Sequence, residues 1–256
     1  MSWAFQYQEK KSFMNNIDPV SKLIWMVCIS VLVFLYETPL PQFYLLMATI
    51  LLALTLANLS LTFILRGIWI MILFSTGFFV LQLIFVPGHT VLFYVGPLPI
   101  YSESLNFATA ITLRILTIFM SSFIFVVSTD PRDIVLALTQ KFKVPYRFAY
   151  AIFVALRFVP TIESEARVIE SAQIIRGVGK QKGLKNKVEN FKRFSMPLLM
   201  GAIRRVRITA NTMDSKGYGA YRDRTYIRTV SITTKGKIFA AIWVLTLIFA
   251  IVLKII

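Results

Sequence analysis

Five apolar runs, each near the length of a membrane-spanning helix, constrain this 256-residue chain more than any other feature. A bilayer core about 30 Å thick takes about 20 helical residues to cross. Hydrophobic residues make up 57% of the chain and charged residues 16%, so one soluble core of this size could not bury the apolar surface. We therefore expect an all-α integral membrane protein with about five transmembrane helices. The runs are Pro19–Tyr36, Leu40–Leu56, Leu61–Val86, Leu105–Val127 and Ile238–Ile256.

The distribution of positive charge predicts how these helices are oriented. The chain has 28 Lys and Arg against 12 Asp and Glu, a net charge of +16. Glu163–Gly236 holds 16 of the basic residues and six acidic ones, a local net charge of +10, whereas Pro87–Ser104 contains neither Lys nor Arg. Because basic loops stay in the cytoplasm, we expect Glu163–Gly236 and the N-terminus, with Lys10, Lys11 and Lys22, to lie inside. The C-terminus would then lie outside.

These expectations divide the chain into three regions. Residues 1–127 form an N-terminal membrane region with four helices, residues 128–236 a cytoplasmic and interfacial region, and residues 237–256 a last membrane helix. Arg66 and Arg114 fall inside two of the apolar runs. A charge at that depth indicates either a functional residue or one that pairs between helices or reaches the membrane surface, and we favour the second interpretation.

Two helix starts are predicted by the same dipeptide. Asp18-Pro19 and Asp130-Pro131 each place an Asp at the N-cap and a Pro at the first helical position. Asp133 adds a favourable negative charge to the first turn of the second helix. The first apolar run should therefore begin at Asp18, and a short cytoplasmic helix should follow Asp130.

Two longer helices should follow in the basic region. Tyr146–Arg176 spans 31 residues, about 46 Å as a helix, and changes from apolar in its first half to amphipathic in its second. A basic, Gly-rich linker over 177–187 should separate it from a helix that runs from about Val188 to Lys216. Both helices end in a basic residue followed by Gly, which is typical of an ordinary helix C-cap. Their repetition in one loop also favours a paired cytosolic partner.

Several short motifs follow one another along the chain, and their order and spacing are informative together. They are Asp18-Pro19 with Lys22; Thr129-Asp130-Pro131; Val144-Pro145; Arg157 to Pro160; Glu165-Ala166-Arg167; Pro197-Leu198-Leu199; and Asp214 to Gly219. Together they resemble the T components of energy-coupling factor (ECF) transporters, the EcfT/CbiQ family. The resemblance covers nearly the whole chain and is strongest over Thr129–Gly219. Asp18, Pro19, Lys22, Arg157 and Pro160 correspond to family signature positions.

The resemblance implies a transport function. In that family two coupling helices each end in an X-Arg-X motif that docks on one of two cytosolic ABC-type ATPases. The matching residues here are Ile175-Arg176-Gly177 and Ser215-Lys216-Gly217, where Ala-Arg-Gly is usual at both. Lys216 keeps the charge of the usual Arg but loses its planar fork, which should make the second contact less geometrically specific, with packing from Tyr218 beside it.

The resemblance also implies the other partners. A separate substrate-binding S component in the membrane would pack against the first long helix, where Ala149, Ala151 and Ala155 permit close approach. ATP and magnesium would bind the partner ATPases and no cofactor would bind this chain. The imported substrate would be a micronutrient, a vitamin or a transition-metal ion. The protein would be a multi-pass protein of a prokaryotic plasma membrane.

The residues themselves argue against two other classes of function. An enzyme acting on lipid headgroups could use the basic region to bind anions, but the chain has a single His, His89, in a loop expected outside, and a single Cys, Cys28. Gly179-Lys180 lacks the Ser or Thr of a phosphate-binding loop, so no ATP site is expected. A nucleic-acid-tethering protein is disfavoured because the basic residues lack an aromatic stacking platform. We therefore expect neither catalysis nor nucleic-acid binding.

Overall fold

The protein is described from a computed structural model. The structure describes residues 12–95, 98–177, 184–221, 229, 231 and 233–255. The chain divides into two compact units, each described by itself below. The first unit comprises residues 1–137 and 230–256, and the second unit comprises residues 138–229.

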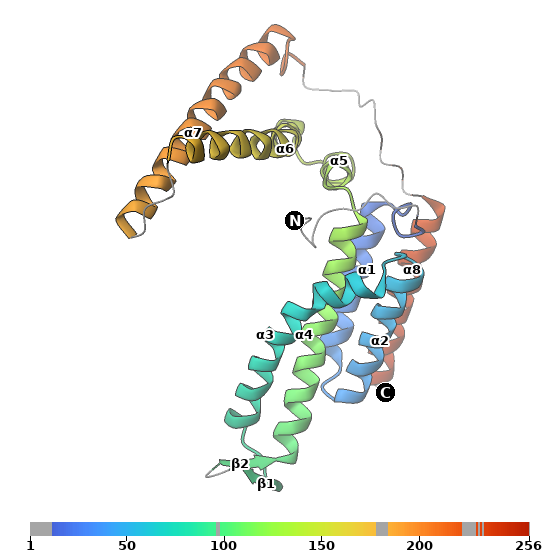
Figure 1. Cartoon of the computed structure of the whole chain (residues 1–256). Helices are drawn as coiled ribbons and strands as arrows, with labels where there is room; N and C mark the ends of the chain where they lie inside the picture. The colour runs from blue at the N-terminus through green and yellow to red at the C-terminus, as the bar shows by residue number, and fades with distance from the viewer. Residues whose placement is uncertain are drawn as a thin grey trace. The chain divides into compact units, whose positions relative to one another are not determined.

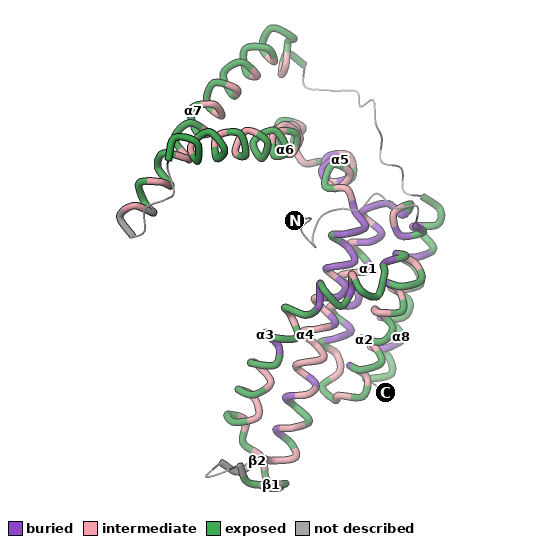
Figure 2. The backbone as a smooth tube through the Cα atoms, viewed as in Figure 1, coloured by how far each residue is buried: buried purple, intermediate pink, exposed green. Residues whose placement is uncertain are grey.

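The first unit is a bundle of apolar helices (Figure 1). α4 packs against α1, α2 and α3, while α8 packs against α1. The core is formed by α1, α3 and α4 residues such as Trp25, Ile64 and Phe123, and Figure 2 shows buried backbone concentrated on α1 and the end of α4. The helices are α1 (Pro19–Leu35), α2 (Pro39–Thr55), α3 (Leu61–Phe85), α4 (Ser102–Ser128) and α8 (Thr234–Ile255).

The lengths of these helices bear on how many of them cross a membrane. α3, α4 and α8 are long and apolar enough to span one, and their outward apolar side chains suit lipid contact. α1 and α2 are apolar but have only 17 residues each. The all-α membrane fold is thus confirmed, and the count of five crossings stays a prediction for α1 and α2.

Both predicted Asp N-caps are present. The Asp18 carboxylate accepts hydrogen bonds from the backbone N–H of Ser21, at 3.1 Å, and from the Ser21 hydroxyl, at 2.8 Å. Asp130 accepts from the backbone N–H of Arg132 at 2.9 Å, just before α5 (Pro131–Lys141). These bonds satisfy backbone donors that the first turn of a helix leaves without a partner.

The C-terminal end of α1 is capped by side chains from other helices. Gln42 and Arg114 both donate to the carbonyl oxygen of Tyr36, at 2.7 and 2.9 Å. Lys254 donates to the carbonyl oxygen of Leu35 at 2.6 Å. Unpaired carbonyls are costly where water is scarce, so these donors stabilise the helix end. Arg114 is therefore an interhelical partner, the interpretation favoured from the sequence.

The loop between α3 and α4 contains a β-hairpin that the sequence analysis missed. β1 (Val91–Val95) pairs antiparallel with β2 (Leu98–Tyr101), with Phe93 opposite Ile100. The Glu103 carboxylate accepts from the Thr90 hydroxyl at 2.9 Å and ties the hairpin to the first turn of α4. α4 accordingly begins at Ser102, three residues before the predicted run.

The second unit is built on two long helices. α6 (Tyr146–Ile175) matches the predicted helix closely and contains Pro160. α7 (Leu184–Ser215) begins four residues before the predicted start at Val188, so the last part of the predicted linker is helical. The rest of that linker, residues 178–183, lies outside the described residues. α6 and α7 are mostly exposed (Figure 2).

Candidate functional site

α6 and α7 run antiparallel within the second unit. Three contacts fix their pairing. The Tyr218 ring, just past the end of α7, lies 4.9 Å from the Tyr150 ring near the start of α6. Arg205 and Glu165 form an ion pair midway, and at the far end the Gln173 amide donates to the backbone carbonyl of Arg193 at 3.4 Å. The C-terminal ends of the two helices therefore lie at opposite ends of the pair.

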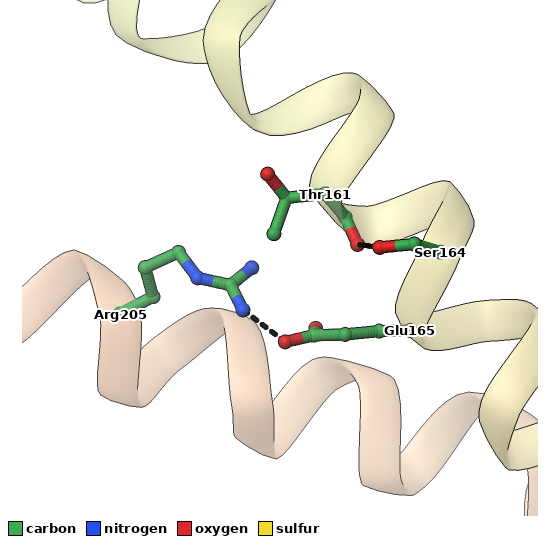
Figure 3. A network of polar contacts seen from close by, with 4 residues as sticks. All are labelled: Thr161, Ser164, Glu165 and Arg205. Atoms are coloured by element: carbon green, nitrogen blue, oxygen red, sulfur yellow. Dashed lines mark hydrogen bonds and ion pairs between the residues drawn. The ribbon is translucent and has the colours of Figure 1, made fainter.

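Midway along the two helices, a polar contact lies beside an aromatic ring. Arg205 donates a hydrogen bond to the Glu165 carboxylate across the two helices (Figure 3). The Arg205 guanidinium also lies 5.5 Å from the centre of the Phe158 ring, a favourable cation–π geometry. Gly201 on α7 faces the Glu165 carboxylate. These contacts hold the register of α6 against α7.

The first predicted docking motif is an exposed helix end. Arg176 caps α6, and the backbone N–H of Gly177 bonds to the carbonyl of Ile174 at 2.9 Å. Gly177 has φ +81°, a left-handed conformation that suits glycine. Ile175 is 86% exposed and lies beside the exposed Arg176. An exposed apolar side chain next to an unshielded cation is available to a partner.

The second motif ends in a more complete cap. The backbone N–H of Gly217 bonds to the carbonyl of Asp214, and that of Tyr218 bonds to the carbonyl of Met213 at 3.0 Å. This pair of bonds, with Gly217 at φ +70°, is a Schellman motif. Ser215 and Lys216 are exposed just before it. The predicted C′ glycine is thus confirmed at both helix ends.

A tyrosine cluster lies beside Lys216, and only its member Tyr218 was predicted to pack there. The Tyr218 ring packs on Tyr146, at 5.9 Å, as well as on Tyr150, and the Tyr146 hydroxyl donates to the carbonyl of Tyr221. These tyrosines line a hollow of about 270 Å³ together with Lys216 and its neighbours. Tyr146 and Tyr150 are four residues apart in a helix and so share a face, which was the one available sequence signal.

The small residues proposed to contact a membrane partner differ in accessibility. Ala151 and Ala155 are exposed, whereas Ala149 is only 6% exposed, and the contact of all three with a membrane partner stays a prediction. Ala151 lines a second groove of about 400 Å³ between α6 and α7, with Phe158 and Val206 on its walls.

The remaining signature residues lie in different places. Arg157 and Pro160 are exposed on α6. Asp18, Pro19 and Lys22 are buried in the first turn of α1, in the first unit. Within the described ranges, no group of three His, Cys, Asp or Glu side chains is placed to hold a metal ion.

Comparison with known proteins identifies one family. Residues 10–227 match the family described as cobalt transport protein (CbiQ). The energy-coupling factor transporter transmembrane protein EcfT of Brevibacillus brevis is 30% identical over 254 residues, covering 95% of this chain and 94% of that protein. The protein of the same name from Streptococcus equi subsp. equi is 31% identical over 260 residues, covering 97% and 95%. That of Lactococcus lactis subsp. cremoris is 30% identical over 231 residues, covering 87% and 86%.

The residues that match the family include both long helices and their basic-Gly ends. With its apolar bundle and paired amphipathic helices, the chain belongs to the CbiQ/EcfT family, and it is a transmembrane T component of an ECF transporter.

Proposed function

We propose that this T component couples ATP hydrolysis on two cytosolic ABC-type ATPases to a separate substrate-binding S component in the membrane. Ile175-Arg176-Gly177 docks on one ATPase and Ser215-Lys216-Gly217 on the other. ATP and magnesium bind the ATPases, where hydrolysis takes place, and this chain supplies neither a cofactor site nor a catalytic group. The cargo is a micronutrient, a vitamin or a transition-metal ion, and the S component selects it.

The antiparallel pairing of α6 and α7 is the observation that carries this proposal. Because Tyr218 packs on Tyr150, the Lys216 end lies near the start of α6, and Arg176 lies at the other end. Between Tyr150 and Ile175 a helix rises about 38 Å at 1.5 Å per residue. That separation suits two protein domains side by side and is too great for both cations to enter one pocket.

The chemistry of the two ends supports protein docking. Arg176 offers a planar fork that can grip a carboxylate with two parallel hydrogen bonds, and exposed Ile175 adds apolar contact area. Lys216 offers a single ammonium beside the tyrosine-lined hollow. The first contact therefore depends on directional hydrogen bonds, and the second depends more on charge and on aromatic packing.

The apolar half of α6 is the proposed contact for the S component. Ala151 and Ala155 are exposed there, and small residues let a second helix approach closely. The first unit would lie in the lipid bilayer of a prokaryotic plasma membrane as five crossings, with the N-terminus and the strongly basic second unit on the cytoplasmic side. Topology then accounts for the basic charge without any nucleic-acid partner.

Co-purification tests the proposal. The detergent-solubilised complex with its ATPases is compared for wild type, Arg176→Ala, Lys216→Ala and the double variant, with Arg167→Ala as a control. Arg167 is also an exposed α6 arginine, but it pairs with Glu163 on its own helix. We expect loss of both ATPases from the double variant, a larger loss for Arg176→Ala than for Lys216→Ala, and none for the control. Full ATPase recovery in the double variant would show that the two cations only cap helices.

A further inference from the structure

The chain passes between its two units at two places only. It leaves the first unit after residue 137, in α5, and returns at residue 230, just before α8. Any movement of α6 and α7 must reach the membrane helices through these connections or through direct contact. Residues that hold these connections to the membrane helices would decide how much of the movement is passed on.

Lys22 holds the start of α5, the helix through which the chain leaves the first unit. Its side chain is 1% exposed, and its ammonium donates to the carbonyl oxygen of Ser128 at 2.8 Å and lies 3.4 Å from the Thr129 hydroxyl. Ser128 is the last residue of α4, so this carbonyl is one that the helix leaves without a partner. The carboxylate of Asp133, in the first turn of α5, also interacts electrostatically with the ammonium. A single α1 side chain thus fixes the α4–α5 junction.

Asp18 holds the returning connection. One oxygen of its carboxylate caps α1 through Ser21. The other accepts a hydrogen bond from the backbone N–H of Thr233 at 3.3 Å, one residue before α8 begins. Gly236 packs so closely on this carboxylate that a Cβ there would overlap it. Asp18 is 5% exposed, so the contact is part of the interior.

Stability alone is a weak reason for this arrangement. Removing a charge from water costs free energy, and apolar residues of similar size often serve a buried position equally well. Asp18 and Lys22 are four residues apart on one helical turn, so they share a face and interact electrostatically. What they gain over an apolar pair is directed hydrogen bonds to two backbone segments that are more than 100 residues apart in the chain.

We propose that Asp18 and Lys22 are positioning residues that clamp both connections between the units to α1, so that movement of α6 and α7 displaces α4 and α8 as rigid bodies. This inference rests on the proposed coupling function. Without the clamp, the connections would bend, the ATPases would still turn over, and the membrane helices would stay in place. The clamp therefore acts on coupling and not on ATP hydrolysis.

The experiment measures movement within the first unit and needs no knowledge of the cargo. Spin labels are placed at Leu73→Cys on α3 and Leu245→Cys on α8, both exposed positions, in a Cys28→Ser background. The full complex with its ATPases and S component is reconstituted in lipid nanodiscs. The distance between labels is measured without nucleotide and after trapping with ATP and vanadate, beside the rate of ATP hydrolysis.

Three variants separate coupling from folding. Lys22→Met removes the outgoing bond. Asp18→Asn keeps a good N-cap but has one acceptor oxygen instead of two, so it weakens the returning bond without unfolding α1. Lys254→Met is the matched control, because Lys254, like Lys22, donates to a backbone carbonyl at the C-terminal end of a helix, here that of Leu35 in α1, at the end of α1 opposite Asp18 and Lys22. Wild-type distances without nucleotide show that a variant is folded.

We expect the population that shows the nucleotide-dependent distance to fall about three- to tenfold in Lys22→Met and less in Asp18→Asn, within the range by which single residues change a coupling equilibrium. ATP hydrolysis and the Lys254→Met distance change should stay near wild type.

A full distance change in assembled Lys22→Met or Asp18→Asn complexes overturns the clamp, as does a wild-type complex with no distance change. If Lys22→Met does not assemble, Asp18→Asn alone decides. Failure of the docking proposal is a separate result, because it appears as ATPases retained by the Arg176 and Lys216 double variant.

Discussion

Arg205 of α7 reaches across to the Glu165 carboxylate of α6 and at the same time lies over the Phe158 ring. The side chains of the ion pair are 23% and 37% exposed, so the pair is partly shielded from water. Glu163 and Arg167 provide a contrast on α6 itself, because they are 3.9 Å apart and their side chains are 56% and 76% exposed. The two pairs share their chemistry and differ in their surroundings.

We predict different coupling energies for the two pairs. Exposed pairs on one helix contribute about 0.3–0.5 kcal/mol, whereas a partly shielded Arg–carboxylate pair should give about 1 kcal/mol. Arg205→Ala should cost about 0.5–1 kcal/mol more, since it also loses the contact with Phe158. Double-mutant cycles with alanine at both members of each pair, followed by denaturant unfolding in detergent, measure these values. Equal coupling energies for the two pairs would contradict the assignment.

Arg114→Met should destabilise the first unit, because it removes a charged donor from the Tyr36 carbonyl and the guanidinium from the face of Phe34, 5.1 Å away. Hydrogen bonds to charged groups contribute about 1.5–3 kcal/mol, and Gln42 still donates to the same carbonyl, so we expect a loss of about 1–2 kcal/mol. Thermal unfolding in detergent should show a melting temperature about 2–8 °C lower.

Arg66→Met is the matched control, because Arg66 lies on an exposed face of α3. We expect this variant to unfold near the wild-type temperature. A shift as large as that of Arg114→Met would mean that removal of any arginine from these helices, and not loss of the α1 cap, causes the effect.

The sequence predicted the elements whose signals are local. Asp18 and Asp130 marked helix starts, and Gly177 and Gly217 marked helix ends, because capping depends on residues within one turn. The hairpin of β1 and β2 was missed because its apolar residues lay in a segment assigned only by its lack of charge. The run of β-branched and aromatic residues over Val91–Val95 was a usable signal.

The residue contacts that build the candidate site could not be predicted, because the residues that meet are distant in the chain. Tyr150 meets Tyr218 and Glu165 meets Arg205 only after α6 and α7 fold back on each other. Lys22 was identified as a signature position, but its bond to Ser128 spans 106 residues. Ala149 looked equivalent to Ala151 and Ala155 in sequence, and only the folded chain shows that it is buried.

Gly67→Ala should destabilise the packing of α3 on α4. A Cβ at Gly67 would lie 2.8 Å from Cζ of Phe123, a buried core residue, so the ring or a helix must shift. Overpacking of this kind costs about 1–3 kcal/mol. Gly77→Ala on the same helix is the control, because a Cβ there meets nothing within 4 Å.

Since alanine favours helix over glycine by about 1 kcal/mol, Gly77→Ala should be neutral or stabilising. Melting temperatures in detergent should therefore move in opposite directions, or fall for Gly67→Ala alone. Equal decreases in both variants would mean that the space between α3 and α4 is not the cause.

Substitution of Gly177 and Gly217 tests whether the left-handed turns present the docking cations. Both positions have open space around them and positive φ, so a side chain there costs conformational energy and meets no clash. Alanine pays about 1–2 kcal/mol in this conformation, whereas asparagine adopts it more readily. If the turns orient Arg176 and Lys216, ATPase affinity should fall about 5- to 30-fold in the alanine variants. It should fall less with asparagine.

Titration of immobilised T component with the ATPases measures the affinities. Equal affinities for the glycine, asparagine and alanine proteins, at unchanged melting temperature, would mean that the backbone turn does not position the cations and that charge alone recruits the partners.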